Sequence, residues 1–294
     1  MNWLSGSKQR HTRRSTLGII AARASMLCAA LLLAGCSALG LAYQQLPNLT
    51  YWWLDDYFNF TSEQSAQVRN GLDSVAQWHR QTQLEPYAQL LDSAGAMATK
   101  SFTAQQACQW LTDATQRAND IATQVAPLAT PIMASLGPKQ LAHYQAYLDE
   151  RNAAWRDEQL DASPQDRLDF RLKRSIKQLK RFYGSVSSEQ EAGVAQVLAA
   201  SSYQPEQGFE RRLANQARVY AWLQDVSGAP PASYAQHEQA LQTLWTASMQ
   251  WPAERQLAWC QQLVDFHNIM TPAQRQTASE TLAAYARDLR SLQQ

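Results

Sequence analysis

The sequence predicts an all-α protein, an extended or curved bundle of about 8–10 amphipathic helices. Gln and Ala are abundant and runs of β-branched residues are missing, so strand signals are nearly absent. Only 11 Gly and 11 Pro interrupt the 294 residues, and they fall at the boundaries of apolar-periodic segments. A short pattern that starts helices also recurs along the chain.

The recurring helix start is an apolar residue, a small capping residue, two further residues and then Gln. It occurs five times, at 60–64, 102–106, 136–140, 186–190 and 270–274. Thr or Ser at the second position caps the first free N–H groups, and the Gln reaches back to the cap. Pro138 and Pro272 suit the first helical position, where the missing N–H is unbonded anyway. The unequal spacing of the copies argues against a regular solenoid.

Each predicted helix follows from an apolar stripe and its flanking caps. In order, they cover 51–59, 62–83, 86–100, a segment starting at 103, 138–160, 163–184, 188–201, 205–226, 234–250, 252–268 and 272–292. Pro127 and Pro131 are expected to interrupt the helix that starts at Thr103, because an internal proline removes a backbone hydrogen bond. Gly184 is expected to end its helix. The stretch 228–231, Gly-Ala-Pro-Pro, is the clearest linker-like break, so the domain can be subdivided near 227–232.

Residues 1–35 read as a lipoprotein signal peptide. They carry five basic residues and no acidic one, and the apolar run from Ala24 to Leu33 is about half the length of a membrane span. The run closes on Leu33-Ala34-Gly35-Cys36, which has the small residues that a lipoprotein signal peptidase needs before the cysteine. We therefore expect cleavage before Cys36, lipidation of Cys36, a tether over 36–50 and a helical domain over 51–294. The alternative is an ordinary signal peptide cut nearby.

The lipid and the charge together predict the location of the protein and the class of its partners. Acyl chains each contribute ~0.8 kcal/mol per buried CH₂, and two or more make anchoring stable. Ser37 rather than Asp follows the cysteine, which by the usual sorting rule places the protein on the outer membrane, facing the periplasm. Without the five basic residues of the leader, 21 basic residues oppose 25 acidic ones, a net charge of −4. A mildly acidic body argues against a nucleic-acid partner.

Two of the four cysteines are expected to form a disulfide. Cys28 leaves with the leader and Cys36 is acylated, so Cys108 and Cys260 remain in an oxidising compartment. A bridge between them closes a long loop and contributes at most ~5 kcal/mol. The alternative is two separate buried thiols, since cysteine is commonly buried without a bridge.

The aromatic start of the domain is the first candidate site. The spacing of Leu49, Trp53, Tyr57 and Phe60 places them on one helical face, so we expect most of these aromatics in the core. A second face, in the next predicted helix, carries Val68, Leu72, Val75 and His79. Asp55 or Asp56 of the preceding helix is the expected partner of this histidine. In the alternative reading, Asp55, Asp56, His79 and Arg80 form a binding site.

A basic helical face is the second candidate. Arg171, Lys173, Arg174, Lys177, Lys180 and Arg181 lie opposite the apolar stripe of their helix. A solvated face is the simpler interpretation. Otherwise Arg171, Arg174, Lys177 and Arg181 contact an acidic partner, such as anionic lipid head groups, lipopolysaccharide phosphate or an acidic protein. The ten Trp and eleven Tyr, scattered over amphipathic helices, are expected mainly in the core, and a few are further candidates to line a groove for an extended peptide or a glycan.

No catalytic, metal-binding or cofactor-binding motif occurs in the sequence. We therefore expect a non-enzymatic interaction protein, an envelope chaperone, adaptor or assembly factor, whose partner is an envelope protein or an unfolded polypeptide. An alternative is an enzyme that acts on peptidoglycan or another envelope polymer, with a carboxylate of the aromatic start as general acid. A third reading is a binder of anionic lipid or lipopolysaccharide.

Two resemblances bear on this expectation. From Tyr43 onward the chain resembles an uncharacterised family of proteobacterial lipoproteins, a domain family of unknown function. The resemblance rests on the lipobox, 53–57 (Trp-Leu-Asp-Asp-Tyr), Gln64, 78–80 (Trp-His-Arg), 151–152 (Arg-Asn) and Gly184 before the Gln190 helix start. It implies a helical fold and an envelope location. The repeated helix start is also similar to the Leu-Thr-x-x-Gln motif of the Spy/CpxP periplasmic chaperones, and this local likeness implies a chaperone-like function.

Overall fold

The computed structural model describes residue 40 and residues 42–201 and 203–293. The predicted leader, the lipidation site Cys36 and the first part of the tether lie outside these residues. The chain forms two compact units, 1–46 and 47–294. The described part of the first unit is helical up to a turn at Gln45. The apolar clusters and the disulfide described below all belong to the second unit.

The described residues contain helices and no strand, which confirms the predicted all-α class. In chain order the helices are α2 (Leu46–Phe58), α3 (Ser62–Thr82), α4 (Leu84–Ala98), α5 (Ala104–Ala134), α6 (Pro138–Gln159), α7 (Pro164–Tyr183), α8 (Ser188–Ala200), α9 (Pro205–Val226), the 3₁₀ turn η1 (Pro231–Ser233), α10 (Tyr234–Met249), α11 (Ala253–Ile269) and α12 (Pro272–Ser291). Most ends lie within one or two residues of the predicted ones. Gly184 ends α7 as expected, with a φ of 81° that L side chains rarely adopt.

The predicted interruption of the fourth of these helices is wrong. α5 runs without a break through Pro127 and Pro131. This long helix contacts α3, α4, α9, α10 and α11, so tertiary packing on several sides outweighs the local cost of the prolines.

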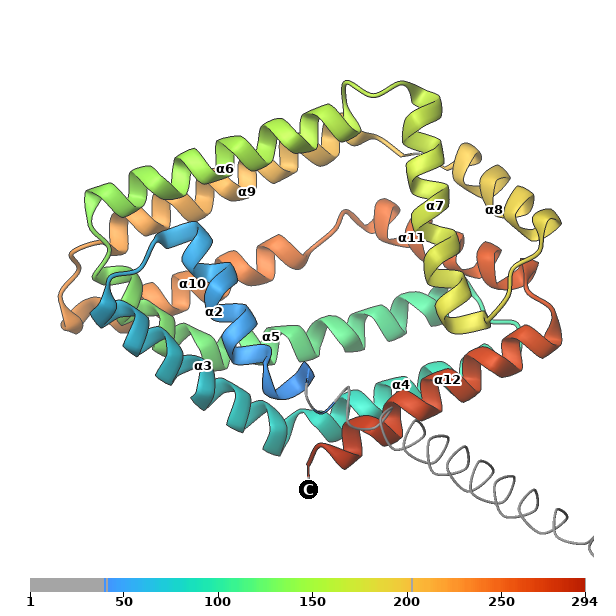
Figure 1. The fold of residues 1–294 in the computed structure, drawn as a ribbon, viewed down its shortest axis with the longest axis horizontal. Helices are drawn as coiled ribbons and strands as arrows, with labels where there is room; N and C mark the ends of the chain where they lie inside the picture. Colours follow the sequence, from blue (N-terminus) through green and yellow to red (C-terminus); the bar gives the residue numbers. More distant parts are fainter. Residues whose placement is uncertain (1–39, 41, 202, 294) are drawn as a thin grey trace, which may run out of the picture. The chain divides into compact units, whose positions relative to one another are not determined.

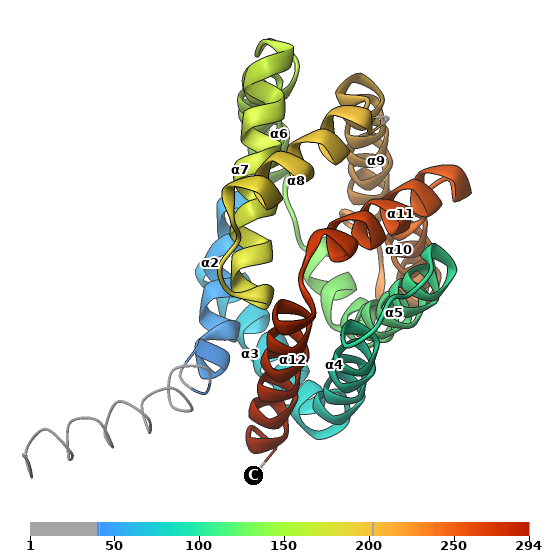
Figure 2. The same cartoon turned by 90° about the vertical axis from the view of Figure 1, so that its right-hand side faces the viewer.

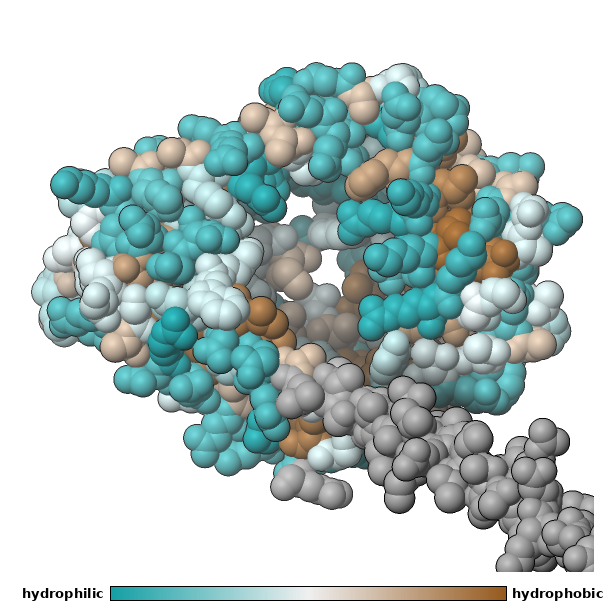
Figure 3. All heavy atoms as spheres, viewed as in Figure 1, coloured by the Kyte–Doolittle hydropathy of each residue, from teal (hydrophilic) through white to brown (hydrophobic). Residues whose placement is uncertain are grey.

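Pairs of helices build the second unit. α6 lies beside α9, α4 beside α12, and α7 beside α8, while α10 and α11 both pack on α5 (Figures 1 and 2). In the space-filling view of Figure 3, openings remain between the α6–α9 pair and the helices below it. The stretch 227–229 docks on the end of α5, where Gly228 N–H donates to the Ala134 carbonyl at 2.8 Å.

Three apolar clusters join most of these helices. The largest joins α2, α3, α6, α9 and the end of α5 around Tyr51, Phe58, Tyr144 and Leu223. A second joins α7, α8 and α11 around Val194 and Leu198. The third lies between α5 and α11, where Cys108 and Cys260 form the expected disulfide, with their Cα atoms 5.6 Å apart.

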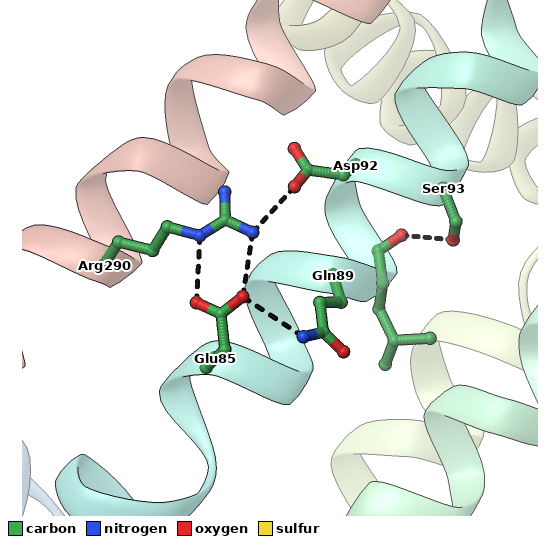
Figure 4. Close-up of polar contacts among 6 residues, drawn as sticks. Glu85, Gln89, Asp92, Ser93 and Arg290 are labelled. Atoms are coloured by element: carbon green, nitrogen blue, oxygen red, sulfur yellow. Dashed lines mark hydrogen bonds and ion pairs between the residues drawn. The ribbon is translucent and has the colours of Figure 1, made fainter.

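The α4–α12 pair is also fastened by a charged cluster at its surface. Arg290 Nε donates to Glu85 Oε2 at 2.9 Å, and its Nη2 donates to Asp92 Oδ2 at 2.8 Å (Figure 4). Gln89 Nε2 adds a bond to the same Glu85 carboxylate at 3.2 Å. The bond to Arg290 lowers the pKa of Glu85. Since the group is solvent-exposed, we assign it a role in orienting α12 rather than a large share of stability.

All five predicted helix starts occur, and four of them are interlocked in pairs. Caps Thr61, Thr103, Ser187 and Thr271 each form a complete capping box with the Gln three residues on. Gly137 has no side chain to offer, so only the return bond from its N–H to Gln140 Oε1 is made, at 3.1 Å.

In the first interlocked pair, the starts of α3 and α6 exchange side-chain bonds. Gln140 Nε2 donates to Gln64 Oε1 at 2.7 Å, and Gln64 Nε2 donates back to Gln140 Oε1 at 3.3 Å. Gln64 Nε2 also donates to the Ser135 carbonyl, two residues before the cap of α6. Gln140 Nε2 likewise donates to the Asn59 carbonyl, two residues before the cap of α3. Gln64 is buried, so these bonds satisfy a polar group that is costly to leave unpaired.

The second pair repeats the arrangement at the starts of α8 and α12. Gln190 Nε2 donates to Gln274 Oε1 at 2.7 Å, and Gln274 Nε2 donates back at 2.9 Å. The carbonyls two residues before the caps, those of Ile269 and Ser185, again accept the second bonds. The pattern that predicted single helix starts therefore also joins helices far apart in sequence.

Candidate functional site

The residues of the predicted aromatic-start site are not brought together. Asp55 Oδ1 accepts the Phe60 N–H at 2.8 Å, so this carboxylate caps the turn that follows α2. Asp56 is exposed, and its main-chain carbonyl lies 3.0 Å from His143 Nε2. Asp55 thus has a structural role in this turn.

His79 and Arg80 lie at the far end of α3 from the two aspartates. The 18 residues from Thr61 to His79 span roughly 27 Å of helix. The expected pairing of His79 with Asp55 or Asp56 is therefore not made. His79 packs beside the Tyr87 ring, 5.6 Å between centroids, and burial lowers the pKa of the imidazole.

The predicted core face of α2 is wrong for Leu49 and Trp53, whereas Phe60 is buried as expected and Tyr57 packs against the largest cluster. Leu49 and Trp53 are exposed, Tyr57 is half-buried, and the buried residues of the helix are Tyr51 and Phe58. The helix ends at Phe58, so Phe60 belongs to the following turn and not to the assumed stripe. The spacing 51, 54, 58 is the one that meets the core.

The basic residues of α7 divide between several contacts. Lys180 pairs with Glu191 at 2.9 Å, and Arg181 donates to the Tyr285 hydroxyl at 3.2 Å. Arg171 turns toward α8. Arg174 and Lys177 remain on the exposed face of α7. The predicted face is thus only partly a free cationic surface.

A groove beside Arg171 gathers the candidate binding residues that the structure adds. It has a volume of about 760 Å³ and is lined by residues of α8 and α11, two helices that Figure 2 shows on the side facing the viewer. Its aromatic and charged lining consists of Arg171, Tyr203, Trp251, Arg255, Trp259 and Asp265, and three amide side chains, Gln196, Gln261 and Gln262, lie among them.

The first residues of α11 and the connection before it build one wall of the groove. Arg255 and Trp259, four residues apart, share a face of α11, and Trp251, which precedes the helix, contacts both. The Trp251 and Trp259 rings meet edge to face, 6.3 Å between centroids and 86° between planes. The Arg255 guanidinium lies 5.2 Å from the Trp251 ring centroid. Both indoles keep more than a third of their surface exposed.

The opposite wall is held by Arg171. Its Nη2 donates to Ser201 Oγ at 2.6 Å, its Nη1 donates to the Leu198 carbonyl at 3.3 Å, and its guanidinium lies 4.3 Å from the Tyr203 ring centroid. These bonds fix the end of α8 and the start of the following connection. Burial lowers the pKa of Arg171 and raises that of Tyr203, which leaves a cation and a neutral phenol at neutral pH.

The chemistry of this groove is that of recognition. Open aromatic faces bind apolar and aromatic groups, and guanidinium groups bind carboxylates or phosphates. Two arginines oppose one aspartate, and Asp265 already accepts a bond from Gln261 at 2.8 Å. The groove therefore presents apolar surface with an excess of positive charge.

Sequence reasoning expected aromatics in a groove without locating them. The signal that marks them is Arg255 and Trp259 on one face of α11, with Trp251 just before the helix, because the core side of that helix is at Cys260, Val264 and His267. Tyr203 and Arg171 carry no such signal, since their meeting depends on how α7 and α8 pack.

A second polar site is buried at the junction of α7, α11 and the α4–α5 connection. His267 is fully buried, with Nδ1 2.9 Å from the Tyr183 hydroxyl and Nε2 3.0 Å from the Lys100 carbonyl. A carbonyl only accepts, so Nε2 carries the proton and Nδ1 accepts from Tyr183. Burial and nearby Arg275 lower the pKa of His267, and burial raises that of Tyr183 to about 12. We name this uncharged set of hydrogen bonds, from His267 to Tyr183 and to the Lys100 carbonyl, the His267 latch, and we assign it a structural role.

Within the described ranges, no helix combines the length and hydropathy needed to cross a bilayer. Across the same ranges, no group of three or more His, Cys, Asp or Glu side chains is arranged to hold a metal ion.

Comparison with known proteins places the chain in one family. A family of unknown function, DUF6279, matches residues 56–255, and the chain belongs to it. The match includes α3 to α10, the start of α11 and most of the groove lining. No curated protein and no solved structure matches the chain.

Proposed function

We propose that this member of the DUF6279 family is a periplasm-facing lipoprotein of the outer membrane that binds extended segments of envelope polypeptides in the groove between α8 and α11. In this role it acts as a chaperone, adaptor or assembly factor without chemistry of its own. The observation that carries the proposal is the set of exposed aromatic rings that line one open groove together with two guanidinium groups.

The geometry of the rings favours a polypeptide over a glycan. A sugar ring stacks on a single flat aromatic face, whereas Trp251 and Trp259 stand at 86° and form a corner that accepts an apolar side chain. Gln196 and Gln262 beside this corner supply amide groups for the backbone of an extended chain.

The charge of the groove favours segments in which apolar and acidic residues alternate. Arg255 lies over the Trp251 ring, so a carboxylate next to a bound apolar side chain meets a cation. The groove is open and its arginines are partly hydrated, which suits weak, reversible binding of many segments better than tight binding of one.

The anchor rests on the sequence. The basic leader, the short apolar run and Leu33-Ala34-Gly35-Cys36 support lipidation of Cys36, and Ser37 supports the outer membrane. The amino-terminal peptide of the membrane-extracted protein is expected to carry diacylglycerol and an amide-linked acyl chain on Cys36. An unmodified amino terminus elsewhere in its mass spectrum would contradict the anchor.

Peptide binding tests the groove. The probes are fluorescein-labelled peptides that alternate Phe with Asp, Phe with Lys, or Ser with Gly, and the readout is fluorescence polarisation. We expect the Phe–Asp peptide to bind best, and the double variant Trp251→Ala, Trp259→Ala to lose at least about tenfold in affinity, since two aromatic anchors are removed.

Trp245→Ala is the matched control. Trp245 is a similarly exposed tryptophan on α10 that does not line the groove, so its loss should leave peptide binding unchanged. Equal binding by the double variant, or equal loss in the control, rules out the groove as the peptide site.

A further inference from the structure

An exposed apolar stripe on α2 indicates a second binding surface, separate from the groove between α8 and α11. Trp52, Trp53 and Leu49 are exposed to 58%, 56% and 52%, the three highest values among large apolar side chains of the described residues. Their spacing of three and four residues places them on one side of the helix. Each of these residues belongs to the second unit of the chain.

The stripe sits on a firmly held helix. On the opposite side of α2, the Phe58 ring stacks on Tyr144, 5.3 Å between centroids and 8° between planes. The Tyr51 hydroxyl donates to Ser65 Oγ at 2.9 Å. The Trp53 ring meets Tyr57 edge to face at 4.9 Å. The outward tryptophans therefore belong to an ordered surface.

The predicted lipid anchor lies close by in sequence. Cys36 precedes Leu49 by 13 residues, which span at most about 45 Å when fully extended. An acylated Cys36 thus keeps α2 near the membrane surface. Tryptophan prefers the interface between water and lipid, where its ring is partly apolar and its N–H stays hydrated.

We propose that α2 lies against the bilayer, with Leu49, Trp52 and Trp53 in the head-group region, and so orients the domain on the membrane. The proposal rests on the lipidation of Cys36 given under the proposed function. The stripe covers roughly 400 Å², using about 250 Å² for a whole tryptophan, and a stable dimer interface takes about 800 Å² from each partner. A bilayer, reached through the tether, is the occupant that this small patch fits, with the three apolar side chains in the head-group region and the exposed Asp56 carboxylate among them facing its water.

Single-cysteine labelling tests the contact in the full lipidated chain. Cys108 and Cys260 are bridged and Cys36 is acylated in the mature protein, so Trp52→Cys introduces one reactive thiol. An environment-sensitive NBD label is attached there, and the protein is reconstituted in vesicles of phosphatidylethanolamine and phosphatidylglycerol. We expect blue-shifted emission and quenching by nitroxide-labelled head groups. The same label at Trp245→Cys, on α10, should stay solvent-like and unquenched.

A second label separates loss of contact from loss of folding. Asp56 is exposed on the same side of α2, and Asp56→Cys should be quenched in an otherwise wild-type chain. Adding Leu49→Ser, Trp52→Ser and Trp53→Ser should abolish that quenching while the far-ultraviolet circular dichroism keeps its helical amplitude, because no core side chain is changed.

Each other outcome overturns the proposal. A solvent-like label at position 52 on an acylated chain rejects membrane contact by α2 and leaves the anchor standing. If the label's emission is blue-shifted without vesicles and the shift grows with protein concentration, the stripe binds a second copy of the chain. If the emission is blue-shifted without vesicles at every concentration, the stripe is covered by the preceding part of the chain. The amino-terminal mass of the same sample reports acylation separately, so its absence rejects the anchor.

Discussion

At the scale of single residues, the glutamines at helix starts do more than cap. A capping-box Gln ordinarily satisfies one N–H of its own helix. Gln64, Gln140, Gln190 and Gln274 each also bind the amide of a partner Gln and a carbonyl before the partner's cap. Helix initiation and tertiary pairing are therefore coupled through the same side chains.

Removal of one interlocked glutamine should cost more than removal of an ordinary capping glutamine. Gln64→Ala leaves buried acceptors and the partner amide unsatisfied, so we expect a loss of about 2–3 kcal/mol in the free energy of unfolding. Gln106→Ala removes the same capping box from α5, where the Gln is exposed and meets no second Gln, and should cost about 1 kcal/mol or less. Urea denaturation compares the two, and equal losses would contradict the coupling.

The His267 latch predicts a dependence of stability on pH. The pKa of His267 is lower in the folded protein than in the unfolded chain, so the unfolded state binds more protons below about pH 6.5. The latch contributes fully above that pH, and its contribution falls as the pH drops toward the folded pKa. Urea midpoints at pH 7.5 and pH 5.0 should differ more in the wild type than in His267→Gln, which does not titrate. A variant with an unchanged difference would show that other groups set the dependence.

The helix starts and the aromatic start show which features a local residue pattern predicts and which it does not. The cap residues and the final Gln located every one of the five helix starts, because capping is a local interaction. The same pattern carries no information on which starts meet, since the partners lie 76 and 84 residues apart. The core face of α2 was wrong for Leu49 and Trp53 because a stripe was extended past the end of the helix, and the true end depends on the bond from Phe60 N–H to Asp55.

At the scale of elements, the long helix α5 organises the molecule. It contacts the helices before and after it in the chain, and the disulfide joins it to α11. Its continuity through Pro127 and Pro131 could not be read from propensity, because the compensating contacts come from α3, α10 and α11. The bridge itself was predictable from the count of the cysteines and from the oxidising compartment expected for them.

Loss of the disulfide should weaken the junction of α5 and α11. The bridge closes a span of 152 residues, so the double variant Cys108→Ser, Cys260→Ser should lose up to ~5 kcal/mol of stability. Thermal unfolding with and without reductant checks this. Reductant should lower the melting temperature of the wild type and leave that of the double variant unchanged; a wild type insensitive to reductant would contradict a stabilising role.

At the scale of the whole molecule, our proposal places polypeptide binding in the groove between α8 and α11. The groove exists because α7, α8 and α11 meet around the second apolar cluster and leave Trp251, Trp259 and Tyr203 at its rim. From the composition we expected most aromatics in the core and a few in a groove; the position of this groove depends on the packing of three helices, which no local pattern predicts. The basic residues of α7 proved to be divided between α8, α12 and solvent for the same reason.

Photo-crosslinking in living cells tests the central claim most directly. A p-benzoylphenylalanine at position 259, in the groove wall, should give adducts that protease removes and muramidase does not, in the outer-membrane fraction. The same photo-reactive group at position 245 should give few. Adducts at 259 that only muramidase removes, or equal yields at both positions, would contradict a polypeptide-binding groove.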